Sequence, residues 1–108
     1  MHEDDNQILI PPSFIALYSD ARGRLRLPLD ELRARYELCE DLACHLMEQA
    51  GQIYHGGARS EEGVLQGMHA GLAAPGTGVS AAEARWITLR LAELLNWRSP
   101  ELPEPERV

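Results

Sequence analysis

The residues with the clearest spacing for metal chemistry lie at positions 41, 45 and 48. Asp41, His45 and Glu48 are four and three residues apart, so on a helix they share one face and could offer a metal ion two carboxylates and an imidazole. One helix cannot complete such a site, and the further candidates, His55 and His69, have no characteristic metal-binding spacing. We therefore expect a solvated polar face here, with no metal or other cofactor.

The two cysteines are the next candidates for chemistry. Cys39 and Cys44 are five positions apart, which is about 140° around a helix and unsuited to a disulfide. Cys39 falls in an apolar series, whereas Cys44 lies among acidic residues, which disfavour the reactive thiolate. We expect both thiols to stay reduced and neither to be catalytic. The chain also has no lysine, which excludes Schiff-base chemistry.

Residues 73–80, Ala-Ala-Pro-Gly-Thr-Gly-Val-Ser, resemble the phosphate loop of AAA-type ATPases, Gly-Pro-Pro-Gly-Thr-Gly-Lys-Ser/Thr. Val79 stands where that motif has its lysine, and no apolar strand ending in Asp-Glu is available to hold magnesium. Nucleotide hydrolysis is therefore not expected. Weak anion binding at the start of a helix needs no lysine, and the candidates for it are Gly76, Thr77, Gly78 and Ser80.

A stripe of aromatic and basic residues near the end of the chain is the strongest candidate for partner binding. It comprises Trp86, Leu89, Arg90 and Trp97. Tryptophan and arginine are enriched in interface hot spots, and a short helix that is apolar on two sides is difficult to bury completely in a small domain. The stripe could form a homodimer interface or dock another protein. The alternative is that residues 8–10 or the first helix cover the tryptophans within one chain.

Four helical segments would position these residues. Pro12 and Ser13 suit the start of a short helix ending near residues 22–23, and apolar residues at every third or fourth position predict a long helix over 29–54. A third helix is expected over 60–74 and a fourth from a capping box at Ser80 and Glu83 to about residue 97. Glycines at positions 63, 67 and 71 either admit a closely packed helix or leave the third segment frayed.

These segments predict an all-α protein, a small four-helix bundle with flexible acidic ends. We expect residues 1–11 to form an arm that docks through residues 8–10, residues 12–98 to form the helical domain, and residues 99–108 to be a disordered Pro/Glu tail. Arg22, Arg24 and Arg26 would be a phosphate site in a basic protein. Here they are expected to lie in a solvated loop.

The composition narrows the classes of partner. The chain has 108 residues and a formal net charge of −7, which opposes binding to nucleic acid and to anionic membrane surfaces. It has no run of about 18–20 apolar residues and no basic leader at its start, so we expect a cytoplasmic protein.

Three stretches of the chain, residues 4–14, 35–43 and 69–75, resemble a small bacterial all-α family. Some of its members carry the label "ATPase with chaperone activity". The resemblance implies a chaperone-related role, while the missing lysine argues against the ATPase half of the label. Three hypotheses follow: a non-enzymatic interaction or adaptor module, either monomeric or homodimeric; a chaperone-related protein; and a nucleotide-hydrolysing or metal-dependent enzyme. We rank them in that order and expect no enzyme.

Overall fold

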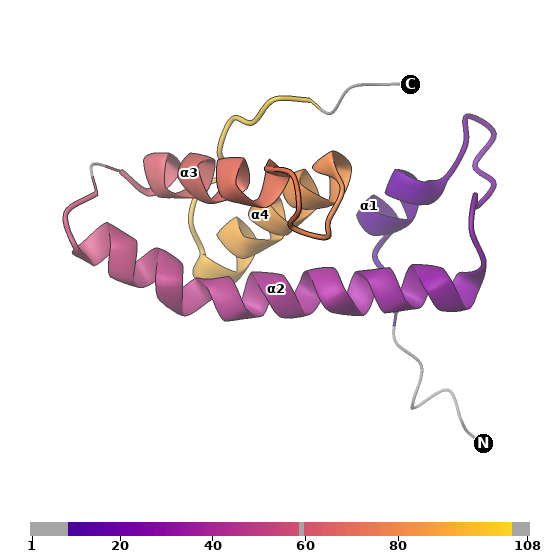
Figure 1. Cartoon of the computed structure of the whole chain (residues 1–108), viewed down its shortest axis with the longest axis horizontal. Coiled ribbons are helices and arrows are strands. Elements are labelled where there is room, and N and C mark those ends of the chain that lie inside the picture. Colours follow the sequence, from indigo (N-terminus) through magenta and orange to yellow (C-terminus); the bar gives the residue numbers. More distant parts are fainter. Residues whose placement is uncertain (1–8, 59, 105–108) are drawn as a thin grey trace, which may run out of the picture. The chain divides into compact units, whose positions relative to one another are not determined.

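The computed structural model describes residues 9–58 and 60–104 of the chain, and it is all-α (Figure 1). The only extended pairing among these residues is an isolated bridge between Ser19 and Leu25. None of the helices in the described part has both the length and the apolar character that crossing a membrane requires. The elements are α1 (Pro12–Ile15), the 3-10 helix η2 (Ala16–Tyr18), α2 (Leu29–His55), α3 (Glu61–Ala73) and α4 (Ala81–Leu95).

The chain divides into two units, residues 1–38 and residues 39–108, and the division falls within α2. In the first unit, Phe14 and Leu32 are fully buried. The ring of Phe14 lies 5.8 Å from that of Tyr18 and 5.6 Å from that of Tyr36, measured between centroids. One aromatic side chain of the short first helix thus anchors the small core of this unit.

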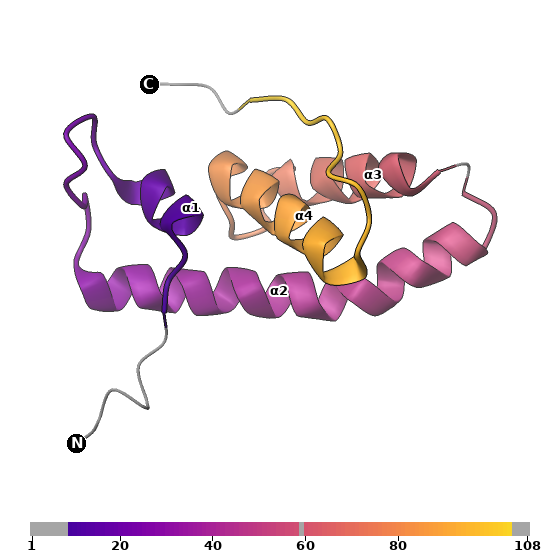
Figure 2. The same cartoon turned by 180° about the vertical axis from the view of Figure 1, so that it is seen from behind.

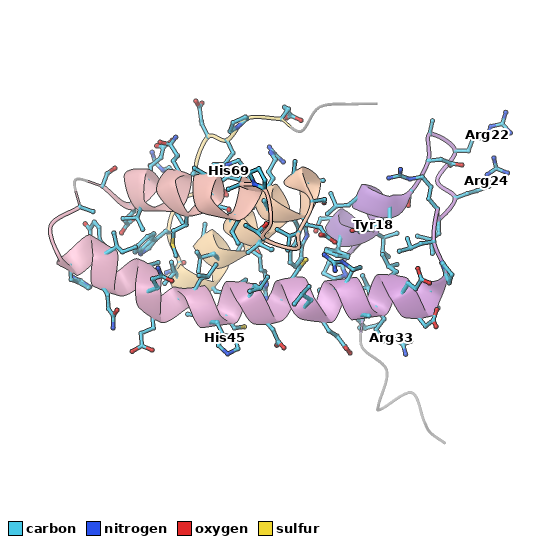
Figure 3. The ribbon with its side chains drawn as sticks, viewed as in Figure 1. Tyr18, Arg22, Arg24, Arg33, His45 and His69 are labelled. Carbon is cyan, nitrogen blue, oxygen red and sulfur yellow. The ribbon has the colours of Figure 1, made fainter. Side chains whose placement is uncertain are left out.

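A tight turn ends the first helical segment at Tyr18, earlier than the predicted residue 22. Ser19 adopts an extended conformation, and the carboxylate of Asp20 accepts hydrogen bonds from the backbone N–H groups of Arg22 and Arg24. The bond from Arg24 is the main reason why the pKa of Asp20 is lowered. The arginine side chains at 22 and 24 point outward from this turn (Figure 3), as expected for a solvated loop.

The second unit is built from α3, α4 and the part of α2 that follows residue 38. Helices α3 and α4 lie side by side in both views (Figures 1 and 2). Small and branched apolar side chains fill the centre, so the three helical segments share one core. The central residues are Ala50, Val64, Leu65, Leu91 and Ala92, with Leu46, Met47, Tyr54, Met68, Leu95 and Trp97 packed around them.

The boundaries of α3 and α4 follow their caps. The hydroxyl oxygen of Ser60 accepts the N–H of Gly63, and Ser80 and Glu83 form the predicted capping box. At its C-terminus α4 ends on Asn96 in the left-handed conformation, with φ of 61°. The third segment is a regular helix, so of the two alternatives for its glycines the frayed one is wrong.

The chain ends differ from expectation where they can be compared. Residues 99–104 were predicted to be disordered, but Pro100 is buried, and Glu101 bonds to α3 through Gln66 and Glu62. Backbone groups of the tail thus form hydrogen bonds with α3, which the amino-acid composition of the tail does not predict. Residues 105–108 and 1–8, including Ile8 of the predicted docking arm, lie outside the described part. Within that arm Leu9 is 86% exposed, so it does not dock.

Candidate functional site

The predicted partner-binding stripe on α4 is largely used inside the molecule. Trp86 is only 8% exposed, and Leu89 is half-buried. Trp97 packs on the core of the second unit, with its ring centroid 5.5 Å from that of Tyr54. The tryptophans are therefore largely covered within the chain, which agrees with the second of the two alternatives that the sequence left open, in which they do not form an open docking surface.

Arg90, the polar member of the same stripe, is also engaged within the chain. Its Nε and Nη2 atoms donate to the two carboxylate oxygens of Glu40 on α2, each at 2.9 Å, and Nη1 donates to Glu93 at 3.0 Å. A bidentate arginine-carboxylate pair has a fixed geometry. These bonds raise the pKa of Arg90 further above its ordinary value. Arg90 thus connects α4 to α2 and is not a free hot-spot residue.

At the candidate anion site at the start of α4, a glutamate side chain of the protein already binds a backbone N–H group. The backbone N–H of Ser80 donates to Oε1 of Glu83 at 2.9 Å, and the Glu83 residue is 1% exposed. Gly76 and Gly78 have φ values of 86° and 88°, so they shape the turn before the helix, and Thr77 bonds back to the carbonyl oxygen of Leu72. The capping box thus already takes up the N–H groups of Ser80 and Glu83, which an anion at this helix N-terminus would otherwise bind.

The described residues contain no cluster of three or more His, Cys, Asp or Glu side chains suited to a metal ion. In the proposed triad, Nδ1 of His45 lies 2.8 Å from the backbone oxygen of Asp41, which is an ordinary bond along one helix. His45 and His69 lie on different helices and point away from each other (Figure 3). Cys39 is buried and Cys44 is exposed, and neither forms a disulfide.

His69 lies on α3, and Arg85 of α4 influences it. Burial is the main cause that lowers the pKa of His69, and the positive charge of Arg85 adds to it. Arg85 itself forms a long ion pair, 3.7 Å, with the exposed Glu104. This local arrangement keeps the imidazole neutral near pH 7.

An apolar groove between α2 and α3 is a candidate binding surface of the second unit. Its volume is about 570 Å³, and we refer to it as the glycine groove. Its floor is apolar and partly buried, while its edges are exposed on both helices. The lining residues are Leu46, Gln49, Ile53 and Ala58 on one side and Gly63, Val64, Gly67, Met68, Gly71 and Leu72 on the other.

The glycines of α3 leave this groove open. A Cβ atom built on Gly67 or Gly71 meets no atom of the described residues within 4 Å, so no packing within this part of the chain requires glycine there. Across the groove, Ile53 is 42% exposed. The apolar period over residues 29–54 includes Ile53, so from spacing alone its side chain is expected to be buried. Glycine at every fourth position of α3 was the signal in the sequence for the groove. This spacing did not show which element would lie opposite the glycines.

No protein-family model, no curated protein and no solved structure matches this chain. The site is therefore interpreted from its own geometry. Of the features above, the tryptophan stripe, the arginine clamp and the capping box serve the fold. The glycine groove is the feature that the fold leaves open.

Proposed function

We propose that this protein is a non-enzymatic interaction module that receives a helix of another protein in the glycine groove. The observation that carries the proposal is the open apolar surface between α2 and α3, where Ile53 is 42% exposed and two glycines are unpacked within the described residues. Exposed apolar grooves with few polar groups are typical of binding surfaces. The groove takes the place of the tryptophan stripe as the docking surface.

A helix fits this surface for two physical reasons. The groove runs beside α3. With 13 residues, α3 is about 20 Å long. A helix presents apolar side chains every three or four residues along such a length, and this is how amphipathic helices bind grooves. The absence of side chains at Gly67 and Gly71 lets a second backbone approach closely.

A chaperone-related role is a second proposal that rests on the same exposed surface. A holdase needs apolar surface that accepts unfolded segments with little regard to their sequence. An adaptor, in contrast, binds only helices of particular sequence. The two roles are separated by mixing the purified protein with an aggregating client: suppression of aggregation by the native chain, and its loss when the groove is filled, would favour the chaperone-related role.

The proposed function is tested with a displayed library of amphipathic helical peptides selected against the full chain. Gly67→Leu fills the groove, and its side chain starts in open space on a regular helix, so the variant is expected to fold. Gly51→Leu is the matched control, because Gly51 is also a helical glycine with open space around its Cβ position but does not line the groove.

We expect enriched peptides to bind the native chain and Gly51→Leu equally, and to bind Gly67→Leu about tenfold more weakly, which corresponds to a loss of about 1.4 kcal/mol. Peptides that bind all three proteins equally would contradict the groove as the docking surface. Failure to enrich any helical peptide would contradict the proposal as a whole.

A further inference from the structure

The segment that follows α4 turns back to α3 (Figures 1 and 2). The backbone oxygen of Glu101 accepts a hydrogen bond from the side-chain amide of Gln66 at 3.0 Å, and the backbone N–H of Glu101 donates to the carboxylate of Glu62 at 3.1 Å. Pro100, the preceding residue, is buried. Residues 99–104, which we call the tail strap, are therefore attached to α3 at a defined place.

The polar contacts of the tail strap are all accessible to water. Glu104 forms its 3.7 Å ion pair with Arg85 of α4 while its side chain is 82% exposed, and such a pair contributes little to stability. Both hydrogen bonds of Glu101 are exposed as well. Water can replace each of these contacts at small cost, which leaves the buried Pro100 as the anchor of the strap.

Helix α3 has less support from the core than α4 has. Only Val64 and Leu65 are buried in α3, whereas seven residues are buried in α4. The three glycines of α3 also lower its helix propensity. A helix with few buried side chains and low propensity opens more easily than the rest of its domain. The strap bonds to this helix at Glu62 and Gln66, one turn apart.

We infer that the tail strap is a conformational device that holds α3 in place, and that release of the strap loosens α3 before the rest of the second unit. The strap is rich in proline and glutamate, which water solvates well, so the released segment is stable in solution. Since α3 forms one side of the glycine groove, the strap also preorganises that side. The inference does not depend on a partner in the groove, so the proposed function and this inference can fail separately.

The test measures native-state hydrogen exchange of backbone amides in the full chain by NMR. Pro100→Gly removes the buried ring and makes the strap more flexible. Pro103→Gly is the matched control, because it makes the same change at an exposed proline of the same segment. The amide of Met68 reports on α3, and the amide of Leu91 reports on the core of α4.

A second variant removes the contact from the side of α3. Gln66→Ala raises the helix propensity, so faster exchange in this variant cannot result from propensity, and the exposed position allows the protein to fold. Gln66 also bonds to Glu62 within the helix at 3.2 Å. Combining Gln66→Ala with Pro100→Gly separates the two contacts, because the bond within the helix does not need the strap.

We expect Pro100→Gly to accelerate exchange of the Met68 amide about fivefold or more, and that of the Leu91 amide less than about twofold. Pro103→Gly should match the native chain. Gln66→Ala should also accelerate exchange at Met68, and it should add no further acceleration when Pro100→Gly is present.

Four results would overturn the inference. Unchanged exchange at Met68 in Pro100→Gly would show that α3 stays closed without the strap. Equal acceleration at Met68 and Leu91 would mean that the segment stabilises the whole unit. Equal effects of Pro100→Gly and Pro103→Gly would assign the change to general flexibility. A full additional effect of Gln66→Ala in the Pro100→Gly protein would show that Gln66 acts within its own helix.

Discussion

The three glycines of α3 differ in what surrounds them. A Cβ atom at Gly63 would approach the hydroxyl oxygen of the capping Ser60 to 3.2 Å, whereas Gly67 and Gly71 face open space among the described residues. Each helical glycine costs about 1 kcal/mol relative to alanine. At Gly67 and Gly71 no contact within the described chain offsets this cost, which is consistent with the proposed role of the groove in binding.

We predict that Gly67→Ala stabilises the protein by about 0.5–1 kcal/mol, because it improves helix propensity without a clash. Gly76→Ala should destabilise it instead, since residue 76 has a φ of 86°, which disfavours a side chain. Urea unfolding followed by circular dichroism gives both free energies of unfolding. A destabilised Gly67→Ala protein would show that packing at this position does require glycine.

His69 provides a test through pH. Its pKa is lowered in the folded protein, mainly by burial, so protonation favours the unfolded chain, in which the pKa is near the ordinary 6.5. The stabilising contribution is complete above pH 6.5 and decreases as the pH falls below 6.5. We therefore expect the free energy of unfolding to drop more between pH 7.5 and 5.5 in the native chain than in His69→Gln. Equal drops in the two proteins would contradict the lowered pKa.

At the scale of elements, the link between α2 and α4 depends on a charged pair. Arg90 and Glu40 are 50 positions apart in the chain and form a bidentate contact that is partly shielded from solvent. Exposed pairs contribute little, but a geometrically fixed and partly buried pair contributes more. The function of Arg90 is thus to hold two helices together.

We predict that Arg90→Ala lowers the free energy of unfolding by about 1–2 kcal/mol and leaves peptide binding to the folded protein unchanged. Arg98→Ala, which removes an exposed arginine just after α4, is the control and should have little effect. A double-mutant cycle with Glu40→Ala isolates the coupling of the pair. A coupling energy near zero would mean that the Arg90–Glu40 pair fixes the orientation of the two helices without stabilising the fold.

For the molecule as a whole, stability in the second unit comes from its shared core. Leu91 is fully buried in that core, whereas Leu9 in the first unit is 86% exposed. Leu91→Ala should lower the free energy of unfolding by about 2–5 kcal/mol, and Leu9→Ala should change it by less than about 0.5 kcal/mol. Trp86 and Trp97 both belong to the second unit, so tryptophan fluorescence reports its unfolding. A large effect of Leu9→Ala would show that the arm does dock.

Local signals in the sequence predicted most of the fold. Serines at positions 60 and 80 cap α3 and α4 as expected, and the long apolar period of α2 extends to His55, one residue beyond the predicted end. These features depend on residues within one or two turns of each other, so spacing alone is sufficient to find them. The short first helix ended early because the Ser19–Leu25 bridge, which spacing does not reveal, competed with it.

By itself, the sequence determined the all-α class, the caps, the charge and the absence of lysine. Only the tertiary structure decided which apolar faces are covered: it buried Trp86, paired Arg90 with Glu40, and left Ile53 beside the open glycines of α3. Periodicity identifies an apolar face but not the element that lies against it. That choice depends on contacts between residues far apart in the chain, and it moved the candidate site from α4 to the groove between α2 and α3.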